Sequence, residues 1–175
     1  MKKLLLLVPL SLAVSGCAID GFLAPPTTGT TAAAPAAGMN IPAFIGRIEA
    51  ARGSALGVAE KAAVGGAVQQ TRGLIDAGQQ RFLGAVAQVS GLDTGTLGIL
   101  FPPAAQPVSQ SEAVGRLEGR LGRQLGGTET QAIKAATLLR NNSLSSLKSG
   151  LAGKVGGMVG LPGEFVESLF PLVGL

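Results

Sequence analysis

The sequence predicts an all-α fold, an irregular bundle of about five helices that follows a disordered N-terminal tether. Residues 39–175 are dominated by residue types that favour helices, and runs of β-branched residues are sparse there. Apolar residues recur at helical spacing, and two Ser/Thr-x-x-Glu/Gln patterns mark helix starts. With 175 residues, the chain is long enough for one modest domain.

The N-terminus has the pattern of an export signal. Lys2 and Lys3 form a positive end, and residues 4–16 are an uncharged, Leu-rich segment. Thirteen residues of helix reach only about 20 Å, which is shorter than a bilayer core of about 30 Å. Residues 1–16 are therefore predicted to be a signal peptide and not a membrane span.

The residues Val14-Ser15-Gly16-Cys17 follow this apolar segment directly. They resemble the lipobox of bacterial lipoproteins, an aliphatic residue and two small residues before a Cys. The resemblance covers residues 1–18 and implies acylation and cleavage at Cys17, with a lipid anchor in the outer membrane. The periplasmic face is the expected side, and exposure at the cell surface stays open. The alternative is a plain secretory signal followed by a coincidental Cys.

Residues 17–38 are predicted to form the lipidated Cys and a low-complexity linker. From residue 24 onward this stretch is uncharged and rich in Pro, Thr and Ala, so it cannot bury enough apolar surface to order itself. Residues 39–175 then form the predicted helical domain.

The first two helices are predicted from caps and spacing. Asn40 caps a short helix with Pro42 in its first turn, and Gly53 ends it. A longer helical pattern opens at Ser54, with a kink or break expected near Gly65 because glycine weakens a helix. The apolar positions of this second pattern recur every seven residues: Val68, Ile75, Phe82 and Val89.

Residues 90–107 are predicted to be a loop that contains either a buried turn or a short helix. The pattern Ser109-x-x-Glu112 then starts a third helix, which Gly126-Gly127 should end. A second pattern, Thr128-x-x-Gln131, starts a fourth helix that we expect to end at Asn141-Asn142.

Ser143 starts the fifth predicted helix, and Pro162-Gly163 breaks it. Residues 144–175 are apolar and sparsely charged, so we expect them to contact a partner or a membrane surface. The candidate contact residues are Leu151, Val155, Met158, Phe165 and Phe170.

Composition excludes several kinds of chemistry. The chain has no His and a single Cys, which excludes a Cys/His zinc site, a Ser-His-Asp centre and an internal disulfide. Glu164 and Glu167 lie three residues apart, a spacing that places two carboxylates on one helix face, but such pairs are usually just solvated. We therefore expect a protein that is not an enzyme, with no metal and no cofactor.

The charge balance argues against nucleic acid as a partner. The formal charge is +4, and Lys2 and Lys3 of the predicted signal peptide supply two of those charges. Aromatic residues make up 3% of the chain, which leaves few platforms for stacking bases.

Two functions remain. The first is a lipid-anchored structural or interaction module of the cell envelope that contacts an envelope protein. The second is a periplasmic carrier that holds a lipid or another apolar ligand among its helices. A contiguous apolar pocket favours the carrier, and an exposed apolar patch favours the interaction module. The sequence leaves the oligomeric state open.

Overall fold

The computed structural model describes residues 38–101 and 106–175, and the described residues form helices and turns. This confirms the all-α prediction. The predicted signal peptide, Cys17 and most of the predicted linker lie outside the described residues. The described elements are α1 (Ile41–Arg52), α2 (Val58–Ser90), α3 (Thr94–Leu100), α4 (Gln110–Leu121), α5 (Gly127–Val159), α6 (Gly163–Ser168) and a 3-10 turn, η1 (Phe170–Val173).

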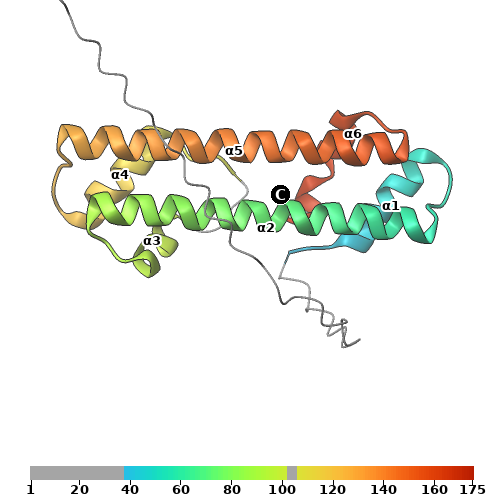
Figure 1. The fold of residues 1–175 in the computed structure, drawn as a ribbon, viewed down its shortest axis with the longest axis horizontal. Coiled ribbons are helices and arrows are strands. Elements are labelled where there is room, and N and C mark those ends of the chain that lie inside the picture. Colours follow the sequence, from blue (N-terminus) through green and yellow to red (C-terminus); the bar gives the residue numbers. More distant parts are fainter. Residues whose placement is uncertain (1–37, 102–105) are drawn as a thin grey trace, which may run out of the picture. The chain divides into compact units, whose positions relative to one another are not determined.

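Two long antiparallel helices organise the domain. Helices α2 and α5 have 33 residues each and make the most extensive contact in the fold. Figure 1 shows them side by side, with α1, α6 and η1 toward one end and α3 and α4 toward the other.

The buried apolar side chains form two separate clusters, one toward each end of the α2/α5 pair. Cluster A combines α1 and the first half of α2 with the second half of α5, α6 and η1. Cluster B combines the second half of α2 and α3 with α4 and the first half of α5. Cluster B consists of Phe82, Leu83, Val86, Leu97, Phe101, Ala113, Leu117, Leu125 and Ile133.

The domain is an internal duplication with an offset of 69 residues. Helix α1 corresponds to α4 and α2 to α5, with the same lengths and with bounds that match at both ends. Helix α3 and α6 also begin 69 residues apart. We call residues 40–108 repeat 1 and residues 109–175 repeat 2. Residues identical at this offset include Gly46-Arg47, Glu49, Gly53, Leu56-Gly57, Glu60, Val86, Gly91-Leu92 and Leu100-Phe101 in repeat 1.

In each repeat, two equivalent glutamate carboxylates hold the turn that precedes the long helix. The backbone N–H of Leu56 donates to Glu49, and that of Leu125 donates to Glu118, at 2.8 and 3.0 Å. In both repeats the N-cap glycine donates its N–H to the glutamate three residues later, at 2.7 Å. The two repeats therefore connect their short and long helices through turns with the same hydrogen bonds.

Several boundaries differ from those predicted. Helix α2 begins at Val58 instead of Ser54 and passes through Gly65 without a break. Helix α5 passes through Asn141-Asn142, so the fourth and fifth predicted helices are one. Its cap is Gly126 and not Thr128, because the Glu129 carboxylate accepts the Gly126 N–H.

Other boundaries are confirmed, except the end of α4. Asn40 caps α1 and Gly53 ends it in a left-handed conformation, while Ser109 caps α4. Helix α4 ends at Gly122, four residues before the predicted stop. The apolar run before Phe101 is the short helix α3, the second of the two alternatives given for it.

Candidate functional site

An apolar groove lies on the seam between α2 and α5. Its volume is about 330 Å³, and all of its lining residues come from these two helices. Leu74 and Leu139 lie at its edge and are 50% and 68% exposed. The residues that line it are Leu74, Ile75, Asp76, Gly78, Gln79, Arg81, Phe82 and Ala85 of α2, and Ala136, Leu139, Arg140, Ser143, Leu144 and Leu147 of α5.

Small residues create the groove. Gly78 and Ala85 of α2 and Ala136 and Ser143 of α5 leave the seam underfilled, since protein interiors are otherwise close-packed. Leu74 and Ser143 are equivalent under the 69-residue offset and lie at the middle of their helices. The groove therefore lies next to the pseudo-twofold axis that relates the repeats.

The floor of the groove is a buried polar network. The Arg140 guanidinium donates through Nε to Gln79 Oε1 at 2.7 Å, and Gln79 Nε2 donates to the Phe101 carbonyl at 2.7 Å. Arg140 also lies over the Phe82 ring, which meets Phe101 edge-on. Burial lowers the pKa of Arg140, but a guanidinium stays charged at any ordinary pH. The network holds the floor rigid and places a cation beneath the apolar walls.

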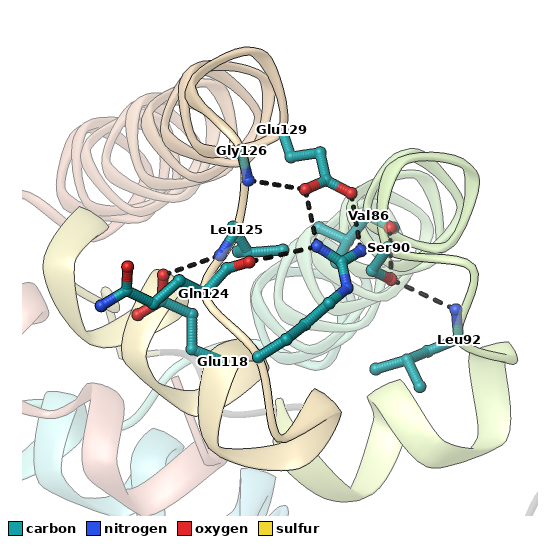
Figure 2. A network of polar contacts seen from close by, with 9 residues as sticks. Val86, Ser90, Leu92, Glu118, Gln124, Leu125, Gly126 and Glu129 are labelled. Carbon is teal, nitrogen blue, oxygen red and sulfur yellow. Dashed lines mark hydrogen bonds and ion pairs between the residues drawn. The ribbon is translucent and has the colours of Figure 1, made fainter.

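A second polar network holds the turn between α4 and α5 (Figure 2). The Arg123 guanidinium donates to both Glu129 oxygens, at 2.9 and 2.8 Å, and Glu129 also accepts the Gly126 N–H. These bonds lower the pKa of Glu129 to about 2, with the Arg123 hydrogen bond as the largest cause. Across from this turn, Ser90 ends α2 by donating to the Val86 carbonyl and accepting the Leu92 N–H. These groups hold turns and do not converge on a cleft.

The candidate carboxylate pair does not form a site. Glu164 and Glu167 are both exposed on α6, and neither lines the groove. Within residues 38–101 and 106–175, no group of three His, Cys, Asp or Glu residues is placed to hold a metal ion. In the same described segments, no helix is long and apolar enough to cross a bilayer.

The predicted contact surface in the C-terminal segment needs correction. Leu151, Val155 and Phe170 are at most 2% exposed and belong to cluster A, so they build the core instead of a contact surface. Met158 packs against the same cluster, and Phe165 is half-buried beside a shallow depression next to α1. The end of the chain is packed too, with Val173 and Leu175 buried.

The exposed leucines at the seam were not predicted as a site. Leu138 and Leu139 are neighbours in α5, and both are exposed. Adjacent helix residues point in directions about 100° apart, so two large apolar neighbours seldom both enter one core. The other apolar positions of this helix already form a buried stripe. Two adjacent leucines outside that stripe are the signal that could have indicated the groove. The predicted lipobox, Val14, Ser15, Gly16 and Cys17, lies outside the described residues.

Comparisons of the chain with protein-family models, curated proteins and solved structures give no match, so the geometry and the sequence carry the functional argument.

Proposed function

We propose that this protein is a lipid-anchored, non-enzymatic interaction module of the bacterial outer membrane, and that its α2/α5 groove docks an apolar helical segment of an envelope protein. The anchor rests on the resemblance of residues 14–17 to a lipobox. The docking function rests on one observation, the apolar groove with exposed leucines at its edge.

A helix is the occupant that fits the groove's geometry. The groove lies along the seam of two antiparallel helices, and its α2 wall runs from Leu74 to Ala85. From the first to the last of these twelve residues a helix rises about 16 Å, which is three turns. A third helix that packs along the seam would place apolar residues at i, i+4 and i+7 over the small residues Gly78 and Ala136.

Charge adds a preference for an acidic partner. Arg81 and Arg140 line the groove, against a single carboxylate from Asp76. An amphipathic helix with Asp or Glu beside its apolar stripe complements this excess of positive charge.

The carrier is the second candidate, supported by the same apolar lining. A volume of about 330 Å³ is at the lower end of the range of ligand pockets. The exposed edge at Leu74 and Leu139 favours a protein segment, because an enclosing carrier would cover its ligand on all sides.

A site-specific crosslink tests the docking function. We expect a photoreactive residue at position 139 to form discrete adducts in the envelope that contain a protein segment. The matched control is position 138, which is also an exposed leucine but does not line the groove. Gly78→Leu should abolish the adducts by filling the groove, since a Cβ at Gly78 has nothing within 4 Å.

The adducts also separate the two functions. A protein peptide bound at position 139 supports the interaction module, and an acyl adduct there replaces it with the carrier. Equal crosslinking at positions 138 and 139, or adducts that survive Gly78→Leu, would contradict both uses of the groove.

A separate experiment tests the anchor. The mature protein should begin at Cys17 with the added mass of its acyl chains and should partition with membranes. Cys17→Ser should abolish that added mass and the acyl-dependent partitioning. A mature wild-type chain without acyl mass would leave a secreted protein and remove the outer-membrane assignment.

A further inference from the structure

We propose that a second copy of this chain can supply either half of the interface between the repeats, so that two chains form an exchanged dimer. In this dimer, repeat 1 of each chain pairs with repeat 2 of the other. The inference rests on the duplication and is independent of what the groove binds.

The two clusters show that the repeats meet as the subunits of a symmetric dimer do. Cluster A takes the first half of repeat 1 and the second half of repeat 2, and cluster B takes the opposite halves. All nine members of cluster B correspond, at the 69-residue offset, to members of cluster A. An interface in which each half contributes the same patch is isologous, the form found in twofold homodimers.

The ends of the repeats are held reciprocally as well. The end of repeat 1 is held by repeat 2, because the Asn141 side chain both donates to and accepts from the Val108 backbone, at 2.7 and 3.3 Å. The end of repeat 2 is held by repeat 1, because Arg72 donates to the carbonyls of Val173 and Gly174. Arg72 and Asn141 are equivalent at the offset. A repeat from another chain would find the same partners.

Differences between the repeats select unlike pairing. Cluster A contains the large Phe44 and the small Ala152, whereas the equivalent positions of cluster B hold the small Ala113 and the large Leu83. Two copies of repeat 1 would therefore place both Phe44 and Leu83 in each cluster and overfill it. Two copies of repeat 2 would combine two alanines and leave it underfilled.

A buried polar pair adds to this selection. Arg140 of repeat 2 pairs with Gln79 of repeat 1, and the equivalent positions hold Thr71 and Lys148. Pairing of two copies of repeat 2 would bring Arg140 toward Lys148, two cations at a buried seam. Repeat 1 with repeat 2 is thus the favoured combination, within one chain or between two.

Two complementary variants test the exchange in the full chain, with Cys17→Ser in every sample to prevent acylation. Gln79→Lys places a cation against Arg140, and Arg140→Thr removes that cation. When the two variants are unfolded, mixed and refolded, the exchanged dimer contains one native Gln79–Arg140 pair. The other half of the dimer pairs the two substituted positions, 79 and 140. The native chain has the same two residue types, Lys148 and Thr71, at the equivalent positions. We expect a 1:1 dimer by light scattering, at least about tenfold more abundant than in either variant refolded alone.

Two controls make the outcome decisive. A single chain with both substitutions should fold as a monomer, because its own halves are then compatible. Gln80→Lys, the same change at an exposed neighbour, should give no enrichment when mixed with Arg140→Thr. The proposal is overturned if the mixture contains only monomers or fails to fold while the double variant folds.

Discussion

Glutamate carboxylates accept the hydrogen bonds that hold the turns before the two long helices. Glu49 and Glu118 accept backbone N–H groups seven residues ahead, and Glu60 and Glu129 accept the N–H of their own N-cap glycine. The first four N–H groups of a helix lack partners within that helix, so the N-cap carboxylates also favour the positive end of the helix dipole. For Glu49, Glu60 and Glu129, these bonds lower the pKa, so the ionised form is the one that stabilises the fold.

Acid should therefore destabilise the domain. The pKa values of Glu49, Glu60, Asp93 and Glu129 are all lowered in the folded chain, that of Glu129 to about 2 from 4.5. A lowered folded pKa contributes stability that is present above the unfolded pKa and is lost as pH falls through the folded pKa. We expect the urea midpoint to be constant near neutral pH and to fall steadily from about pH 5 toward pH 2.

Glu129→Gln is the matched test of this pH dependence. The amide keeps a hydrogen-bond acceptor but cannot ionise, so the variant should lose stability at neutral pH and show a shallower decline in acid. A decline between pH 5 and pH 2 as steep as that of the wild type would contradict the role assigned to Glu129.

Local sequence signals predicted some caps and missed others for a physical reason. Ser109 was identified correctly as the N-cap because its hydroxyl accepts the Glu112 N–H. Thr128 was wrong because the Gly126-x-x-Glu129 arrangement competes two residues earlier and is held by Arg123 as well. Sequence spacing shows that a helix starts in this region, and the competition between two nearby local patterns decides at which residue.

At the scale of helices, packing overrides weak propensity. Glycines in α2 and the Asn141-Asn142 pair in α5 predicted breaks that do not occur. Each glycine costs about 1 kcal/mol relative to alanine, which the extended α2/α5 seam offsets. Asn141 has a tertiary role, since its side chain pairs with the Val108 backbone. Residues that weaken a helix locally can be retained for contacts that sequence spacing does not show.

Two glycine-to-alanine substitutions should therefore have opposite effects. Gly66 is exposed within α2 and a Cβ there has nothing within 4 Å, so Gly66→Ala should stabilise the domain by about 0.5–1 kcal/mol. A Cβ at Gly156 would lie 2.6 Å from the Leu161 carbonyl oxygen. Gly156→Ala should destabilise the domain by about 1–3 kcal/mol. Urea unfolding measures both, and an equal effect of the two changes would contradict this account of α5.

Burial in the two clusters predicts the cost of core substitutions. Phe44 is fully buried in cluster A, and Phe44→Ala should cost about 3–5 kcal/mol. Leu83 is buried in cluster B, and Leu83→Ala should cost about 2–5 kcal/mol, because it also leaves a cavity. Urea unfolding measures both losses.

The matched control for Leu83→Ala is the same change at an exposed leucine, Leu139→Ala. Leu139 is 68% exposed, so this change should alter stability by no more than about 0.5 kcal/mol. Equal losses at positions 83 and 139 would contradict the role of Leu83 in a buried cluster.

For the whole molecule, the sequence predicted helical content but not the organisation. The apolar stripes indicated which residues are buried, and Val68 and Phe82 are both in the core. The pairing of α2 with α5 depends on contacts between residues far apart in sequence, which local periodicity does not contain. A shift of the sequence by 69 positions against itself aligns Gly46-Arg47 with Gly115-Arg116 and Leu100-Phe101 with Leu169-Phe170. That self-similarity predicts the duplication from sequence alone.

The start of repeat 1 lies next to the end of repeat 2, which predicts that the domain tolerates circular permutation. The Asn40 N–H, at the start of repeat 1, donates to the Leu172 carbonyl at 2.9 Å. Leu175 corresponds to Gln106 at the offset, so the positions after Leu175 and after Gln106 are equivalent points of the fold. A chain that runs from Pro107 to Leu175, continues directly from Gly38 and ends at Gln106 keeps every helix intact.

This permutant should retain the helical circular dichroism of the parent domain and unfold in one cooperative transition. Its stability should fall by no more than a few kcal/mol, because both clusters and the α2/α5 seam remain. The control permutant opens the chain between Leu74 and Ile75, within α2, and interrupts the seam that both clusters share. If opening at Gln106 were as damaging as opening within α2, the two repeats would not be equivalent halves, and the symmetric interface would not be what holds the domain together.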